Sequence, residues 1–243
     1  GYFDPYEREI TPHLRHENTL FIEVECPDEH KKMRKRMITG VFSHWDCLDP
    51  GSNPGGIWLP VDVQYSGPVR IQHVRCHSES FDARFAQLHY TVALDAASAD
   101  TVLLRWTIAP RTFAGPVQVV EQRRRLRKGA QQIGGLLKVR DPRLWWTHDL
   151  GNPDLYIITL EVWQGERLSD RYDFDFGIRH FELRNWIPYL NGVRFLIKGN
   201  NYPPGDMRIA TMELWRYERD MRLACDCHLN LLRVHAHVEL PDF

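Results

Sequence analysis

Apolar residues recur at every second position in several stretches of the chain, which predicts β-strands with one buried face. In one stretch Val102, Leu104, Trp106 and Ile108 follow this period, and we expect Trp106 to lie in the core. The stretches with this pattern are residues 20–24, 88–94, 102–108, 156–162 and 172–178. Strands of this kind, separated by turn residues, predict an antiparallel sandwich.

Glycine and proline residues indicate where the β structure is interrupted. Asp46–Gly56 contains two Pro and three Gly, which predicts a loop. Gly67-Pro68 predicts a domain boundary, because residues 70–180 have the length of roughly 110 residues that is usual for one immunoglobulin-like sandwich. Residues 1–69 are too few for a complete β domain, so we expect them to be part of one.

The pattern changes after Asn191-Gly192, a dipeptide favoured in two-residue type I′ turns because both positions need positive φ. The apolar run Val193–Ile197 predicts a strand, residues 209–228 have a helical period, and Asn230–Val234 predicts a second strand. A strand–helix–strand unit requires parallel pairing. One such unit leaves open sheet edges, so we expect the sheet to continue after residue 243 and the chain to be a piece of a longer protein.

The near-neutral overall charge gives no reason to expect a polyanionic partner. Lys and Arg total 31 against 32 Asp and Glu, a net charge of −1, so we expect neither nucleic acid nor an anionic membrane as a partner. The apolar runs fall far short of the ~20 residues that cross a bilayer. Two basic runs, residues 30–36 and 123–128, indicate solvated loops or edge strands protected by charge.

The cysteines favour a reducing compartment. There are five, an odd number and few for 243 residues, which argues against a disulfide framework and favours the cytoplasm. Cys225 and Cys227 lack a Cys-x-x-Cys spacing, so we expect both thiols to be buried.

Four motifs, in this order along the chain, resemble the multidomain β-glycosidases of glycoside hydrolase family 2, which includes β-galactosidases, β-glucuronidases and β-mannosidases. They are Asn53–Val61, then Asp141–Trp146 with Asn152–Tyr156, then Phe176–Arg179, and last Lys198–Pro203 with Arg219-Asp220 and Asn230–His235. The resemblance covers most of the chain. It implies a mainly β fold in three parts: residues 1–69 as the C-terminal part of a sugar-binding jelly roll, residues 70–180 as an immunoglobulin-like β-sandwich, and residues 181–243 as the first βαβ unit of a (β/α)₈ barrel.

The resemblance also implies an activity. Retaining glycosidases hydrolyse O-glycosidic bonds of β-linked sugars with two carboxylates, an acid/base and a nucleophile, and need no cofactor. The resemblance puts both carboxylates after residue 243, so we expect no catalytic residue in this chain and no turnover by it alone. The alternative is a non-catalytic carbohydrate-binding or scaffold β-sandwich protein. The expected partner is a β-linked carbohydrate, and a homo-oligomer is left open.

The candidate substrate-binding residues follow the two expected barrel strands, because barrel active sites lie at the C-terminal ends of strands. The resemblance implies that Arg233 lies in the sugar pocket, where a fixed cation keeps a carboxylate ionised; the alternative is an Arg paired at the surface. His235 and His237 share one side of the strand and suit sugar contact better than metal binding, since no third ligand is evident. Asn201 and Tyr202 are expected to line the pocket, although Asn201 could instead bond loop backbone.

Substrate specificity is left open by the same motifs. Pro203-Pro204 is closer to the β-mannosidase branch, whereas His235-Ala236-His237 replaces that branch's Trp-Gly-Gly. Among the Trp residues, only Trp45 and Trp58, which flank the Gly-rich loop, are candidates for stacking on a sugar ring.

Overall fold

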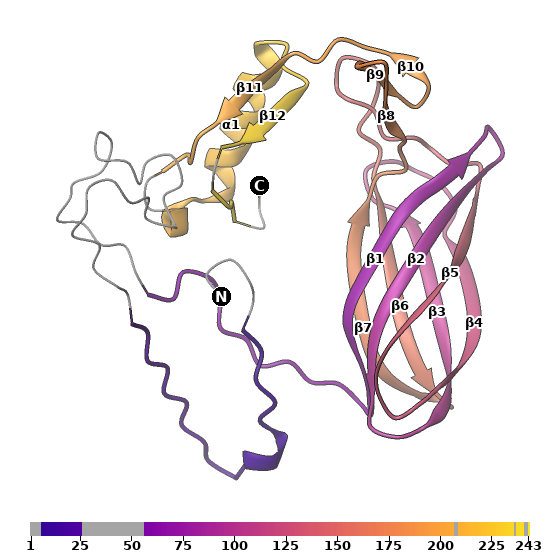
Figure 1. Ribbon diagram of the computed structural model, residues 1–243, viewed down its shortest axis with the longest axis vertical. Helices are drawn as coiled ribbons and strands as arrows, with labels where there is room; N and C mark the ends of the chain where they lie inside the picture. The colour runs from indigo at the N-terminus through magenta and orange to yellow at the C-terminus, as the bar shows by residue number, and fades with distance from the viewer. Residues whose placement is uncertain (1–5, 26–55, 207–208, 236, 241–242) are drawn as a thin grey trace. The chain divides into compact units, whose positions relative to one another are not determined.

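The computed structural model describes residues 6–25, 56–206, 209–235, 237–240 and 243, and divides the chain into two compact units (Figure 1). One unit is Val63–Leu196, and the other combines Gly1–Asp62 with Ile197–Phe243. Each unit is described here by itself. No helix among the described residues is long and apolar enough to cross a membrane.

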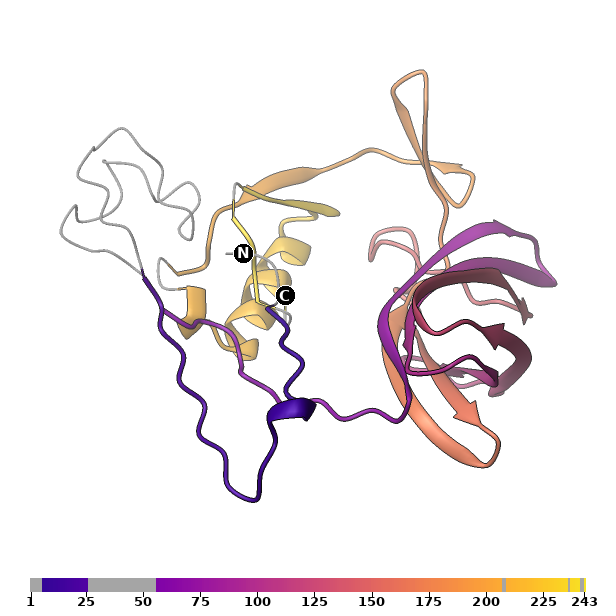
Figure 2. The same ribbon diagram turned by 60° about the horizontal axis from the view of Figure 1, so that its bottom comes forward.

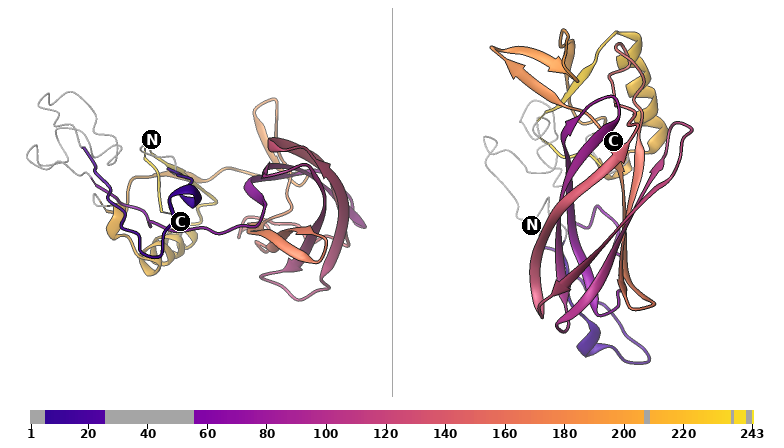
Figure 3. Two further views of the ribbon diagram at one scale, coloured as in Figure 1. Left: turned by 90° about the horizontal axis from the view of Figure 1, so that it is seen from below. Right: turned by 90° about the vertical axis from the view of Figure 1, so that its right-hand side faces the viewer.

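The first of these units contains a sandwich of two antiparallel sheets, which face each other in Figures 2 and 3. One sheet has the strand order β1-β2-β5, and the other has the order β4-β3-β6-β7. The strands are β1 (Val69–Phe81), β2 (Phe85–Ala96), β3 (Asp100–Pro110), β4 (Gln118–Leu126), β5 (Gly129–Arg140), β6 (Tyr156–Gln164) and β7 (Arg167–Phe176). This arrangement confirms the predicted sandwich.

The core lies between the two sheets and is built from the alternating positions. Trp106 of β3 is fully buried, and its ring centroid lies 4.6 Å from that of Tyr90 on β2. The predicted strands at residues 88–94, 102–108 and 156–162 are confirmed, with every even-numbered residue in them buried. The predicted strand at residues 172–178 is confirmed in part, because β7 ends at Phe176 and Tyr172 is 36% exposed.

Three strands have no regular alternation in the sequence. In β1 the buried residues change from odd to even positions, from Val69 and Ile71 to Val74, because a β-bulge lies between Ile71 and His73. In β4 and β5 half-buried and exposed residues alternate, many of them Gln, Arg or Gly, and the buried residues, Leu126, Leu137 and Val139, lie toward the strand ends. Residues 123–126 of the basic run lie on β4, an edge strand, and residues 127–128 lie in the turn after it, in agreement with a loop or edge strand protected by charge.

One side of the sandwich is closed by side chains of β7 that bind the backbone of β1. The buried Ser169 hydroxyl accepts the Val69 N–H at 2.8 Å and donates to the Val69 carbonyl at 2.9 Å. The Asp170 carboxylate accepts the Ile71 N–H at 2.6 Å. A Cβ at Gly67 would lie 2.7 Å from the Ser169 hydroxyl oxygen, so only glycine fits there. These bonds join the two sheets where β1 begins.

A small sheet follows the sandwich, with strand order β10-β9-β8. It comprises β8 (Phe181–Arg184), β9 (Ile187–Leu190) and β10 (Val193–Arg194). Asn191 and Gly192 join β9 to β10 with φ of 51° and 81°, which confirms the predicted type I′ turn. The prediction that Val193–Ile197 is the first strand of the βαβ unit is wrong, because β10 ends at Arg194 and pairs antiparallel with β9.

The βαβ unit itself is present, but its first strand begins later in the chain than predicted. Its strands β11 (Gly199–Tyr202) and β12 (Leu231–Val234) pair in parallel, and α1 (Leu214–Asp226) connects them. The helix has 13 residues, fewer than the 20 of the periodic segment, because a short 3₁₀ turn (Ile209–Thr211) precedes it. Tyr217 is its buried residue. Membership of a complete barrel stays a prediction.

The predicted strand at residues 20–24 is wrong. Among residues 6–25 the regular element is a 3₁₀ turn at Thr11–His13, and Leu20 is 69% exposed. An alternating pattern forms a strand only where a neighbouring strand pairs with it, and none of the described residues pairs with this segment. Assignment of residues 1–69 to a jelly roll therefore stays a prediction.

Two of the cysteines are more exposed than the sequence predicted. Cys225 and Cys227 are exposed, which overturns the prediction of buried thiols there. Cys225 lies in the last turn of α1 and Cys227 follows it, on a helix surface that no described residue covers. Cys76 on β1 is half-buried, and burial raises the pKa of its thiol to about 12. Cys26 and Cys47, the basic run at 30–36 and Trp45 lie outside the described residues.

Candidate functional site

The parallel strands of the βαβ unit bring two of the predicted residues together at their C-terminal ends. Asn201 on β11 and Arg233 on β12 are register partners. The Arg233 guanidinium donates from Nη1 to Asn201 Oδ1 at 3.0 Å, and both residues are exposed. No other partner of this guanidinium occurs among the described residues, so its remaining N–H groups are available to an anion or a hydroxyl.

Tyr202 differs from Asn201 in pointing toward the helix. Its hydroxyl donates to Asp220 Oδ2 of α1 at 2.9 Å, and its ring stacks on Phe243 with centroids 5.0 Å apart. Burial and the hydrogen bond to the Asp220 carboxylate raise the pKa of the Tyr202 phenol above its ordinary value. Tyr202 therefore holds β11 against α1. Both Asn201 and Tyr202 lie within the first strand, whereas the sequence predicted them after it.

His235 continues the parallel pairing one residue past β12. Its N–H donates to the Tyr202 carbonyl at 3.0 Å. The side chain is half-buried, and Nδ1 is a buried atom without a hydrogen-bond partner among the described residues. A neutral imidazole with one unused nitrogen can donate or accept one further hydrogen bond.

His237 is turned into the unit and is enclosed by protein groups. Its side chain is 0% exposed, with Nδ1 2.9 Å from the His235 carbonyl oxygen and Nε2 against Glu239 Oε1. The Tyr217 hydroxyl of α1 donates to the other carboxylate oxygen of Glu239 at 2.6 Å. Because a carbonyl oxygen only accepts, the contact at Nδ1 requires this nitrogen to donate, and Nε2 faces the Glu239 carboxyl group.

This cluster of Tyr217, His237 and Glu239 ties the segment after β12 to the helix. Both ring nitrogens of His237 and both carboxyl oxygens of Glu239 have partners within the unit, as buried polar groups require. The helical period of residues 209–228 predicted the helix that carries Tyr217, but no local motif pointed to Glu239. No group of three or more potential metal ligands occurs among the described residues.

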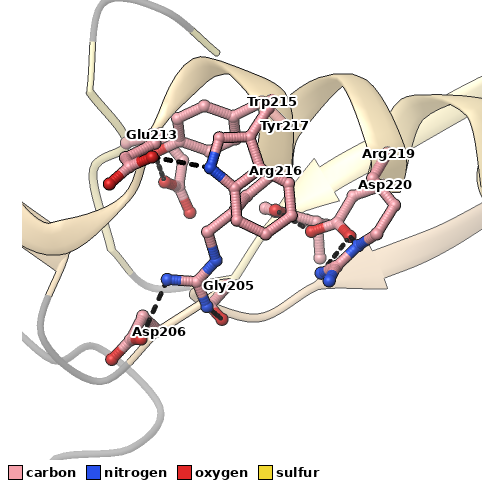
Figure 4. A network of polar contacts seen from close by, with 10 residues as sticks. Gly205, Asp206, Glu213, Trp215, Arg216, Tyr217, Arg219 and Asp220 are labelled. Carbon is pink, nitrogen blue, oxygen red and sulfur yellow. Dashed lines mark hydrogen bonds and ion pairs between the residues drawn. The ribbon is translucent and has the colours of Figure 1, made fainter.

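A second set of contacts holds the loop after β11 against the helix (Figure 4). Arg216 of α1 donates to Asp206 at 3.0 Å and to the Gly205 carbonyl at 3.2 Å. On the helix surface, Arg219 binds Asp220 Oδ1 at 2.8 Å, leaving Oδ2 to Tyr202. Positions 216 and 220 are four apart, so both face the strand side of one helix. The helix thereby orients both strand ends.

The glycosyl hydrolases family 2 model matches residues 69–179, which are the seven strands of the sandwich and the segment that follows. This match confirms the predicted resemblance to glycoside hydrolase family 2. Two of the four motifs, Asp141–Trp146 with Asn152–Tyr156 and Phe176–Arg179, lie in the matched range. The sandwich of this chain carries the core described above, and the βαβ unit lies outside the matched range.

This chain is similar over its whole length to two curated glycosidases. It is 27% identical to a mannosylglycoprotein endo-beta-mannosidase of Lilium longiflorum and 24% identical to an exo-beta-D-glucosaminidase of Streptomyces avermitilis, with 100% of this chain covered in both. The matched parts are 29% and 27% of those proteins. The chain therefore spans less than a third of the length of the curated relatives it matches.

Solved structures share the fold. A family 2 glycosyl hydrolase of Bacteroides cellulosilyticus superposes with a TM-score of 0.65 at 21% identity, covering 73% of this chain and 25% of that one. The beta-D-mannosidase of Dictyoglomus thermophilum gives a TM-score of 0.62 at 22% identity, covering 69% of this chain and 21% of that one.

Proposed function

We propose that this chain is part of a retaining β-glycosidase and that Arg233 and Asn201 contribute to its sugar-binding pocket. One observation carries the proposal: two parallel strands present an exposed arginine, bonded to an asparagine, at their C-terminal ends. In (β/α)₈ enzymes this is the end of the strands at which active sites are built. Similarity to two glycosidases over the whole of this chain supports the same conclusion.

The chemistry proposed for the whole protein needs two carboxylates about 5 to 5.5 Å apart. One protonates the leaving oxygen and the other attacks the anomeric carbon, and water then releases the sugar. We assign both to the protein beyond residue 243. Arg233 acts on this pair as a fixed cation, which favours the ionised form of the attacking carboxylate and orients it. Asn201 fixes the position of the guanidinium through its 3.0 Å bond.

The proposed substrate class is a β-linked mannoside or glucosaminide. The relatives carry the names endo-beta-mannosidase and exo-beta-D-glucosaminidase, and a beta-mannosidase A of Aspergillus terreus matches 44% of the chain. These two sugars differ at carbon 2, in the configuration of that centre and in hydroxyl against amine. A residue that contacts the substituent at carbon 2 therefore decides between them.

The test uses the full-length protein and a panel of p-nitrophenyl glycosides: β-mannoside, β-glucosaminide, β-galactoside and β-glucuronide. We expect turnover of the first or the second. Arg233→Ala should lower kcat/KM for that substrate by about tenfold or more, because an interaction with the reacting centre is lost. It should leave Tm near that of the wild type, because the side chain is exposed.

A matched control is Arg222→Ala, which removes an exposed arginine of α1 and should leave the rate unchanged. An unaffected rate in Arg233→Ala would remove Arg233 from the pocket. Absence of turnover on the whole panel, with saccharide binding retained, would favour a carbohydrate-binding or scaffold protein instead. The 243-residue chain alone should hydrolyse none of the four substrates.

A further inference from the structure

The hairpin between β8 and β9 contains a backbone conformation that its sequence does not favour. Asn185 and Trp186 form its two-residue turn, with φ of 50° and 65°. Asparagine adopts positive φ readily, whereas for a bulky side chain such as tryptophan this region is strained.

The next hairpin of the same small sheet is an internal comparison. Its turn, Asn191-Gly192, has φ of 51° and 81° and uses glycine in the second position. The two turns therefore have the same pair of positive φ angles with different residues in the second position. Trp186 is the residue that glycine could replace without strain.

Packing within the described part of the chain does not offset this strain. The Trp186 side chain is 90% exposed, whereas tryptophan in a folded domain usually buries most of its ring. Strained residues persist where surrounding contacts hold them, and they concentrate at binding sites. The contact that compensates Trp186 must therefore come from something other than the described residues.

The surroundings of the indole indicate the chemistry of that contact. Trp186 borders an open depression of about 410 Å³, whose other lining residues are Ile187, Pro188, Arg194, Phe195 and Leu196. This volume lies within the range of small-ligand clefts. The Arg194 guanidinium is exposed and has no partner among the described residues. An aromatic face beside a cation rich in donors suits a pyranose ring, whose C–H face packs on the indole while its hydroxyls accept hydrogen bonds.

The hairpin holds this face in position. Arg184 is paired with Glu182 on the same strand, β8, and its guanidinium lies 4.5 Å from the ring centroid of Tyr189 on β9. Phe181 and Phe195 meet edge to face, with centroids 6.2 Å apart. A turn anchored on both strands loses little conformational freedom when a ligand binds.

We propose that Trp186 and Arg194 form a carbohydrate-binding platform that accepts a pyranose unit of a β-linked saccharide. The indole stacks on the ring and the guanidinium donates to its hydroxyls. The choice of a saccharide as the ligand rests on the proposed function, while the strained and exposed turn is an independent observation.

The experiment measures stability and affinity in the same variant of the full-length protein. Trp186→Gly should raise Tm, because glycine relieves the positive-φ strain. The same variant should weaken binding of soluble linear β-1,4-mannan or chitosan by roughly tenfold, as measured by affinity electrophoresis, because an aromatic anchor is lost. Arg194→Ala should also weaken binding. Asn185→Gly keeps the indole and should retain the affinity.

Each outcome decides the proposal. A lower Tm in Trp186→Gly would mean that the rest of the protein covers the indole, and an unchanged affinity would mean that no saccharide binds there; either result overturns the platform. Failure of the wild-type protein to bind either polysaccharide overturns it as well. Saccharide binding through Trp186 without turnover of any p-nitrophenyl glycoside would sustain the platform while refuting the proposed enzyme.

Discussion

Single side chains replace backbone pairing where β1 meets β7. Ser169 forms two hydrogen bonds with the backbone of Val69, whose side chain is 1% exposed. Because Val69 is buried, water cannot readily replace these hydrogen bonds, and its N–H and carbonyl both depend on the Ser169 hydroxyl. The same crowding leaves no space for a side chain at Gly67.

Ser169→Ala should therefore destabilise the sandwich by about 1–3 kcal/mol, because a buried N–H and a buried carbonyl lose their shared partner. The measurement is the free energy of unfolding in urea, followed by Trp fluorescence. Ser80→Ala, at an exposed position of β1, is the control and should change it by no more than about 0.5 kcal/mol. Equal effects of the two substitutions would show that the Ser169 hydroxyl is not needed.

At the scale of elements, α1 orients the ends of β11 and β12. Tyr217 and Asp220 lie on one helix face and reach Glu239 and Tyr202 respectively. Each contact joins the helix to a segment at a strand end, so the helix determines how those ends are presented. His237, which the sequence suggested as a substrate contact, belongs to this internal support with both ring nitrogens engaged.

Glu239→Ala in the full-length protein should lower stability by about 3–5 kcal/mol, because it leaves the buried His237 without its acidic partner. Glu239→Gln should cost much less, since its amide can donate to His237 Nε2 while its carbonyl accepts from Tyr217. Thermal unfolding measures both. Glu218→Ala, on the exposed side of α1, controls for loss of a carboxylate. Equal Tm values for the Ala and Gln variants at position 239 would contradict the proposed hydrogen bonding.

At the scale of the whole molecule, the hydrophobic core belongs to one of the two units. Every residue of the main buried cluster lies between Val69 and Ile178, inside the unit Val63–Leu196. The βαβ unit buries few apolar side chains, and Leu214, Trp215 and Leu223 of its helix are more than half exposed. A unit with a closed core can fold by itself, whereas two parallel strands and one helix bury too little surface to do so.

Residues 63–196 expressed alone should consequently unfold in a single cooperative, β-rich transition. Circular dichroism during heating measures it. Trp106→Ala in the same segment should cost about 3–5 kcal/mol, because the ring fills the centre of the core. Gradual unfolding of the unsubstituted segment would mean that the sandwich depends on the other unit.

Particular elements show how far the sequence predicts this fold. The alternation in β2, β3 and β6 and the turn at Asn191-Gly192 are local properties, and they were predicted correctly. By contrast, the Gly-Asn-Asn-Tyr segment of β11 has few residues that favour strands. It forms a strand because β12 pairs with it and Tyr202 bonds to α1. The role of Glu239 likewise depends on contacts with Tyr217 and His237, which no sequence pattern indicates.

Periodicity, turn chemistry and motif order along the chain were sufficient to predict the antiparallel sandwich, the order strand–helix–strand and the resemblance to family 2. The contacts of the candidate residues follow only from the folded chain: Arg233 meets Asn201 at the surface, and His237 meets Glu239, which no sequence motif marked, inside the unit. Side-chain direction and burial depend on neighbours distant in sequence, and a bulge or a shifted strand start changes them without changing the pattern. The exposure and strain of Trp186 are likewise properties of the folded hairpin.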